Sequence, residues 1–289
     1  MDTLLLHPLT RTDLDHTLAG QTPAILLSGQ VGSGKYYTAR RLAEQQLNLP
    51  ANGLIKYPYF LHIAPKKGGI GIDDIRQLTA FLQLKTVGQR SGYRRAVIIE
   101  DAHTMTLEAQ NALLKSLEEP PNDTVMILTA IPTTSLLGTI YSRVQLVSLK
   151  KPSLTAVQAF YNSQPPTAVA KAYQLSNGAP GLLAALLTDD ASDHPLNTQL
   201  RLAKTVLRQS PYERLIHIDN LLVDKESLRH FLQALKQLAT VGLQQAAGQH
   251  QRTRLTRWHH ILKESYRAET RLLQAANTKL LLTDLLLEL

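Results

Sequence analysis

A glycine-rich segment that ends in a lysine is the first feature of the sequence that could do chemistry. Gly29, Gly32 and Gly34 lead directly into Lys35, with the spacing Gly-x-x-x-x-Gly-Lys of a phosphate-binding loop, or P-loop. Glycines let backbone N–H groups approach phosphate oxygens closely, and a helix that begins at the loop adds its positive end. Lys35 is expected to reach the β- and γ-phosphates. The segment therefore predicts a nucleotide site.

The residue after the lysine departs from this motif. Tyr36 stands where a P-loop has Ser or Thr, whose hydroxyl binds Mg²⁺. A phenol oxygen lies too far from its Cα to take that ligand position. Two interpretations stay open. Either the loop holds a phosphate without a proper metal site, or it is a retained glycine turn that packs a helix on a sheet.

Two carboxylates form the second candidate cluster. Glu100 and Asp101 follow the apolar run 97–99. At this place P-loop ATPases have an Asp that supports Mg²⁺ and then a Glu that polarises the attacking water. The order here is reversed, and positioning is most of the catalysis in phosphoryl transfer. We therefore expect inefficient hydrolysis. In the alternative interpretation both carboxylates are strand-end residues with local structural partners.

These residues need strands and helices to position them. Apolar runs typical of strands alternate with helical stretches, which predicts an α/β domain with a parallel sheet. The expected strands are 24–27, 61–63, 96–99, 125–128 and 144–149. The expected helices are 35–47, 75–84 and 107–118, the last capped by Thr106.

Strand signals stop after residue 150, so the predicted fold class is α/β plus all-α. Three parts are expected: an α/β domain at 1–150, a small helical module at 151–190 and a helical domain at 191–289. Residues 188–197 have the composition of a linker. A long helix is expected at 255–276, because its apolar side chains gather near one face.

Composition excludes several classes of site. The chain has 289 residues and no cysteine, which excludes disulfides, Cys-ligated zinc, iron–sulfur clusters and a thiol nucleophile. None of the ten histidines has metal-ligand spacing, so no metal site is predicted. The formal net charge is +8, and residues 200–289 hold 14 Lys+Arg against 8 Asp+Glu, or +6 of it. This excess indicates either nucleic-acid contact or a solvated surface. Without a signal peptide or a membrane span, a cytoplasmic protein is expected.

The most specific motif lies on the helix expected at 107–118. Residues 111–121 read NALLKSLEEPP, with the acidic strand end before them and an apolar strand after them. This stretch strongly resembles the bacterial clamp-loader subunits of DNA polymerase III, of the delta-prime and gamma/tau type. The resemblance covers nearly the whole chain and is firmest at 24–145. Further similarity is found at 70–76, Ser142-Arg143 and 277–282.

The resemblance implies an AAA+ fold: a P-loop α/β domain, a helical lid and a C-terminal helical collar. It implies partners as well, because five such subunits form a ring that uses ATP to load a sliding clamp on primed DNA. The neighbours would be gamma/tau- and delta-type subunits. Many members carry a Cys₄ zinc knuckle, which the passage 48–53 lacks, so no zinc is expected.

Departures from the family pattern indicate which subunit the chain resembles. Besides Tyr36 and the reversed Glu100-Asp101 pair, Leu182 replaces an arginine that ATP-using members direct at the γ-phosphate. An impaired ATPase on an intact scaffold resembles delta-prime. No cofactor is then required, although low occupancy by ATP or ADP with Mg²⁺ stays open. The alternatives are a gamma-like subunit that hydrolyses ATP, and a nucleic-acid-binding module that uses the basic tail.

Arg143 keeps the family residue. In clamp loaders this arginine reaches the ATP of the neighbouring subunit, so the resemblance implies that Arg143 is a catalytic arginine finger acting in trans. In the alternative interpretation it is a surface arginine that pairs with a nearby acid.

Overall fold

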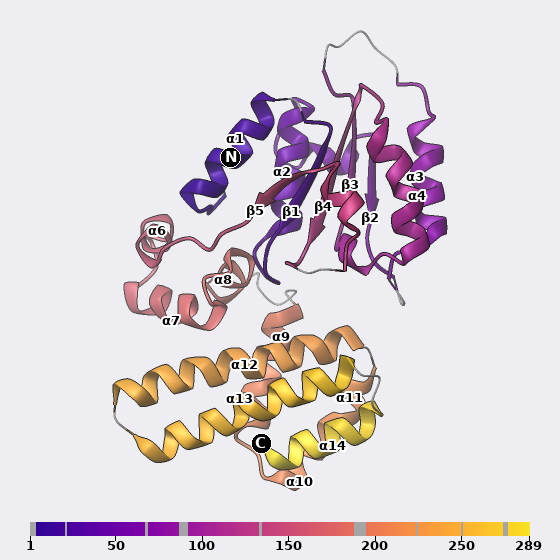
Figure 1. The fold of residues 1–289 in the computed structure, drawn as a ribbon. Helices are drawn as coiled ribbons and strands as arrows, with labels where there is room; N and C mark the ends of the chain where they lie inside the picture. The colour runs from indigo at the N-terminus through magenta and orange to yellow at the C-terminus, as the bar shows by residue number, and fades with distance from the viewer. Residues whose placement is uncertain are drawn as a thin grey trace. The chain divides into compact units, whose positions relative to one another are not determined.

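The chain forms two compact units, Met1–Ser153 and Leu154–Leu289, as seen in a computed structural model (Figure 1). The structure describes residues 4–20, 22–66, 69–86, 92–132, 135–187, 195–223, 225–249, 251–273 and 277–289.

The first unit is built on a parallel five-stranded sheet of order β2-β3-β4-β1-β5. The strands are β1 (Ala24–Ser28), β2 (Phe60–Ile63), β3 (Arg95–Ile99), β4 (Thr124–Ala130) and β5 (Gln145–Ser148). The helices are α1 (Pro8–Ala19), α2 (Lys35–Gln46), α3 (Ile72–Leu82), α4 (Leu107–Glu118) and the short α5 (Gly138–Tyr141), with single 3-10 turns at Gly53–Lys56 and Ala102–Thr104.

Helices cover both faces of the sheet, which explains why the strands read as continuous apolar runs. Ile25 and Leu27 face the core beneath α1 and α2, whereas Ala24 and Leu26 face the core beneath α3 and α4 (Figure 1). The predicted parallel α/β sheet is thereby confirmed.

Helix boundaries follow capping interactions. Thr106 caps α4 as predicted, because its hydroxyl accepts a hydrogen bond from the N–H of Ala109 at 3.2 Å. The helix expected at 75–84 begins earlier, at Ile72. Its start is fixed by Asp74, whose carboxylate accepts a hydrogen bond from the N–H of Gly71 at 3.0 Å.

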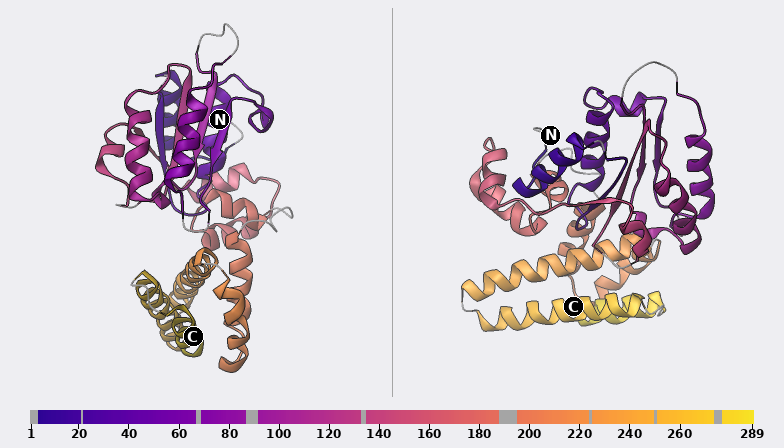
Figure 2. Two further views of the ribbon diagram at one scale, coloured as in Figure 1. Left: turned by 90° about the vertical axis from the view of Figure 1, so that its right-hand side faces the viewer. Right: turned by 45° about the horizontal axis from the view of Figure 1, so that its top comes forward.

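The second unit is helical. Its elements are α6 (Leu154–Phe160), α7 (Pro166–Ser176), α8 (Pro180–Leu187), α9 (Pro195–Val206), α10 (Pro211–Arg214), a 3-10 turn at Leu215–His217, α11 (Ile218–Leu222), α12 (Lys225–Gly248), α13 (Arg252–Leu273) and α14 (Thr278–Glu288). The long helices α12 and α13 pack side by side (Figure 2). One apolar core joins α7 and α8 to α9 and α12, so the predicted separation of a lid from a collar stays a prediction.

Two sequence-based boundaries change in this unit. The linker expected at 188–197 ends earlier, since α9 begins at Pro195; residues 188–194 lie outside the described residues. The helix expected at 255–276 begins at Arg252, and its predicted end at 274–276 also lies outside them. None of the described helices combines the length and the apolar character that crossing a bilayer requires.

Candidate functional site

The P-loop, residues 29–35, joins the end of β1 to the start of α2. Gly32 and Gly34 adopt φ of 78° and 80°, in the left-handed region that favours glycine. A Cβ on Gly29 would lie 2.6 Å from Ser33 Oγ and 3.0 Å from Leu149 Cβ, so there is little room for a larger residue. The sequence therefore folds here into the tight turn that a phosphate cradle needs.

Lys35 turns back into the loop. Its side chain is buried, and Nζ donates hydrogen bonds to the carbonyl oxygens of Gly29 at 3.2 Å and Gln30 at 3.3 Å. Burial lowers the pKa of the ammonium, and the nearby Asp101 and Glu100 partly oppose this. The ammonium is thus held at the place where a phosphate group would meet it.

Tyr36 contacts a residue of β2. Its ring stacks on the imidazole of His62, with ring centroids 4.7 Å apart. His62 Nε2 in turn lies 3.0 Å from Glu100 Oε2, at the end of β3. We call Tyr36, His62 and Glu100 the aromatic–acid cluster. Burial raises the pKa of the Tyr36 phenol, which keeps it neutral.

Asp101 is held by the strand between β1 and β3. Its backbone has φ of 46°, and its N–H donates a hydrogen bond of 3.0 Å to the hydroxyl of Thr129 on β4. Parallel strands place their carboxyl ends at one edge of the sheet, so the P-loop, the aromatic–acid cluster and Asp101 all lie along this carboxyl edge.

The residues at the carboxyl edge do not fit Mg²⁺. Tyr36 and His62 place two rings beside the first carboxylate, and Glu100 pairs with an imidazole. Magnesium requires small oxygen ligands in octahedral geometry. Among the described residues no group of three or more His, Cys, Asp or Glu side chains could hold a metal ion. The glycine cradle and Lys35 fit a phosphate group, whereas the metal half of the site does not fit its ion.

Leu182 sits where ATP-using clamp-loader subunits have an arginine. In the structure Leu182 is fully buried in the apolar core of the second unit. Leu182 therefore serves in packing, and its apolar side chain carries no charge for a phosphate.

Arg143 lies just after α5 and pairs with the last residue of α4. Its Nε and Nη2 lie 3.1 Å and 2.8 Å from Glu118 Oε1. Its Nη1 donates to the carbonyl oxygen of Thr139 and to the hydroxyl of Ser142, both at 3.0 Å. The predicted finger thus makes, within its own chain, the pairing with a nearby acid that the alternative interpretation expects.

Arg143 and the P-loop lie at opposite edges of the sheet. Arg143 precedes β5, which runs parallel to β1 with Gln145 opposite Ile25 near the start of that strand. The P-loop follows the other end of β1. Five residues of β1 span about 16 Å at about 3.3 Å each. Arg143 therefore lies at the amino edge and does not belong to the P-loop of its own chain.

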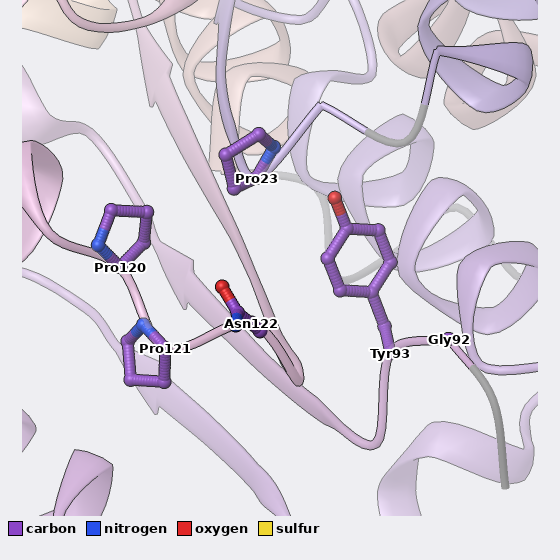
Figure 3. A pocket seen from close by; sticks show the side chains of 6 residues that line it. All are labelled: Pro23, Gly92, Tyr93, Pro120, Pro121 and Asn122. Atoms are coloured by element: carbon purple, nitrogen blue, oxygen red, sulfur yellow. The ribbon is translucent and has the colours of Figure 1, made fainter.

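A small pocket lies on the amino edge as well, because its lining residues directly precede β1, β3 and β4 (Figure 3). They are Pro23, Gly92, Tyr93, Pro120, Pro121 and Asn122. Two of these prolines end α4 and belong to the motif at 111–121. The pocket is therefore separate from the P-loop and close in the fold to the segment that carries Glu118.

Several residues of these sites were missed by sequence reasoning. Their partners are distant in sequence: the separations are 38 positions for His62, 28 for Thr129 and 25 for Glu118. No local spacing reports such contacts. The only available signal was the position of His62 and Thr129 near the ends of expected strands, where side chains of parallel strands meet.

Known proteins resemble about half of this chain. Residues 14–153 match a family described as DNA polymerase III, delta subunit. The delta' subunit of DNA polymerase III from Pseudomonas aeruginosa is 32% identical over 177 residues, which are 54% of this chain and 53% of that protein. Over about half of its length the chain is similar to DNA polymerase III delta-prime subunits. The Escherichia coli delta' subunit is 34% identical over 139 residues, 46% of this chain and 41% of that protein. The chain spans about half the length of these relatives.

The chain is also similar to proteins of the gamma type. A gamma/tau subunit of DNA polymerase III from Mycobacterium bovis is 34% identical over 137 residues, 42% of this chain and 23% of that protein. A crystal structure of a gamma subunit-related protein from Thermotoga maritima superimposes with a TM-score of 0.50 and 23% identity, covering 95% of this chain and 97% of its own. At that identity the likeness concerns the fold. The predicted fold class, a parallel α/β domain followed by a helical region, is confirmed.

Proposed function

We propose that this chain is the delta-prime-like subunit of a DNA polymerase III clamp loader. It would assemble with gamma/tau- and delta-type subunits into a hetero-pentameric ring in the cytoplasm and support loading of the sliding clamp onto primed DNA. The similarity to delta' subunits over residues 14–153 supports this proposal. The helical second unit would supply the ring contacts of the collar.

In this proposal the subunit does not hydrolyse ATP at its own P-loop. The glycine cradle and Lys35 would hold at most a phosphate group, and the aromatic–acid cluster leaves no hard oxygen site for Mg²⁺. Without the metal, the charge that develops on a transferring phosphoryl group lacks its main counter-ion. The P-loop then serves chiefly to pack α2 against the sheet.

The second half of the proposal concerns Arg143 and the neighbouring subunit. The observation that carries it is the position of Arg143 at the amino edge, opposite its own P-loop. Any phosphate that this guanidinium contacts must therefore belong to another chain. An arginine that neutralises charge on a γ-phosphate in trans accelerates hydrolysis by about 10³–10⁵ in other nucleotide hydrolases.

Nucleotide titration of the isolated chain tests the first half. Fluorescent ATP should show no tightening when Mg²⁺ is added, whereas a gamma/tau subunit measured beside it should tighten strongly. A gamma-like ATPase would instead bind ATP with Mg²⁺ in the micromolar range and lose this in Lys35→Ala. That result would overturn the non-hydrolysing role.

Co-purification tests the assembly. A tagged copy of the full chain should recover gamma/tau- and delta-type subunits from its own cells in a stable complex. A chain that recovers neither subunit, but binds DNA alone with a steep salt dependence, would instead favour the nucleic-acid-binding alternative.

A further inference from the structure

The guanidinium of Arg143 makes most of its available contacts with its own chain. It has five N–H groups, and contacts with Glu118, Thr139 and Ser142 account for four of them. Two of the four converge on one carboxylate oxygen of Glu118, Oε1. A phosphate from another chain would need the same charged groups, so it must compete with this carboxylate.

The end of α4 explains why Glu118 pairs so readily. Glu118 is the last residue of α4, where the helix dipole is negative and a carboxylate is unfavourable. Pro120 and Pro121 prevent the helix from continuing. The cation of Arg143 compensates both the carboxylate and the helix end.

A second set of contacts fixes the segment of Arg143 against the helix of Glu118. Gln110 of α4 is buried, and its side chain donates to the carbonyl oxygen of Ser135 at 3.0 Å and accepts from the N–H of Leu137 at 2.8 Å. The segment that leads into α5 is thereby fastened to the body of α4. Glu118 and Arg143 are held close whether or not their ion pair is formed.

We propose that Glu118 is a positioning residue that latches Arg143 to its own chain until the phosphate of a neighbouring nucleotide displaces the carboxylate. This inference rests on the trans arginine finger of the proposed function. The pair can open to solvent, because the two side chains are 33% and 48% exposed. An exposed ion pair of this kind limits the effect of the latch to about two- to five-fold.

The test measures ATP turnover by a ring assembled from the full chain with gamma/tau- and delta-type subunits. Glu118→Gln should raise turnover in the absence of clamp and DNA by about two- to five-fold, and high salt should reduce this difference. Glu119→Gln is the matched control, because no ion pair of Glu119 is found within the described ranges; it should leave turnover unchanged. Glu118→Gln in an Arg143→Ala background should have no effect, since the latch acts only through Arg143.

A chemical readout on the isolated full chain needs no neighbour. Phenylglyoxal modifies accessible guanidinium groups, and peptide mass spectrometry reports the rate at Arg143. Glu118→Gln should raise that rate by a similar factor, while Glu119→Gln should not.

Each outcome has a distinct meaning. If Arg143→Ala lowers turnover but Glu118→Gln leaves it unchanged or lowers it, the latch is wrong and the finger stands. If Arg143→Ala changes nothing, the finger fails, and the latch fails with it. If Glu118→Gln acts equally in both backgrounds or lowers the melting temperature markedly, Glu118 has only a structural role.

Discussion

At the P-loop, Tyr36 replaces the Ser or Thr whose hydroxyl binds Mg²⁺ in this motif. Tyr36 stacks on His62, and His62 pairs with Glu100. The defect is therefore shared by residues from α2, β2 and β3. Restoring one of them leaves the other two in place.

Tyr36→Thr alone should not create Mg²⁺-dependent ATP binding, because the His62–Glu100 pair remains. The triple variant Tyr36→Thr, His62→Ala, Glu100→Asp should gain it, since two short oxygen ligands then face an open position. Tyr37→Thr, at the exposed neighbouring tyrosine, is the control and should bind as the unaltered chain does. Titration with fluorescent ATP, with and without Mg²⁺, measures this. Full Mg²⁺ dependence in the single variant would show that His62 has no part in the defect.

Residue-level prediction from the sequence worked where chemistry follows local spacing. The glycines of the P-loop and the unusual Tyr36 can be read directly from the sequence. Gly32 and Gly34 adopt the left-handed backbone conformation that favours glycine. The partners of those residues are not visible, because His62 and Thr129 meet them only after the strands have paired. The sequence alone identified the altered P-loop position Tyr36, but not that its ring stacks on His62.

At the scale of elements, α4 organises the amino edge. Gln110 ties it to the approach to α5, and Glu118 ties it to Arg143. The Gln110 amide also donates to the carbonyl oxygen of Met105 at 3.2 Å, in a buried hydrogen bond. Replacing this amide by an apolar group is costly, because a buried carbonyl then loses its partner.

Gln110→Leu should lower the free energy of unfolding by about 2–4 kcal/mol, since the N–H of Leu137 and the carbonyl oxygen of Ser135 lose this partner. Asn111→Ala, one position along the helix and exposed, should stay within about 0.5 kcal/mol. Urea unfolding of the full chain measures both. Equal stability of the two variants would contradict the view that Gln110 holds the segment before Arg143 against α4.

The hairpin of α12 and α13 depends on one close contact. A Cβ on Gly242 would lie 2.2 Å from Trp258 Cε2, so the indole packs directly on the helix backbone. Gly242→Ala should cost about 1–2 kcal/mol, because the strain of overpacking exceeds the gain in helix propensity. Gly248→Ala, at the end of the same helix with open space around its Cβ position, should be neutral or stabilising. Thermal unfolding compares them, and a stabilised Gly242→Ala would contradict the contact.

Element prediction was accurate where capping and periodicity act locally. Thr106 identified the start of α4, and apolar runs identified the strands. It was less accurate at 188–197, where a Pro was taken as part of a linker although Pro195 begins α9. Proline suits the first turn of a helix, so the same residue type marks both situations.

At the scale of the whole molecule, the sheet of the first unit places the P-loop and Arg143 at opposite edges. Because the length of β1 separates the two, the proposed function can assign no hydrolysis to the P-loop and still assign a role in trans to Arg143. The motif at residues 111–121 predicted the similarity to delta-prime subunits, because it is specific. That the P-loop and Arg143 lie at opposite edges of the sheet follows only from the order and direction of the strands.

The central claim is that this subunit contributes Arg143, and not its own P-loop, to ATP hydrolysis by the ring. The decisive measurement is steady-state ATP turnover by the assembled complex with clamp and primed DNA. Two variants of this chain are compared, Lys35→Ala and Arg143→Ala. The account predicts that Lys35→Ala leaves turnover unchanged. Arg143→Ala should lower it, because such an arginine accelerates hydrolysis at the site that it serves by about 10³–10⁵. Loss of turnover in Lys35→Ala with none in Arg143→Ala would contradict it.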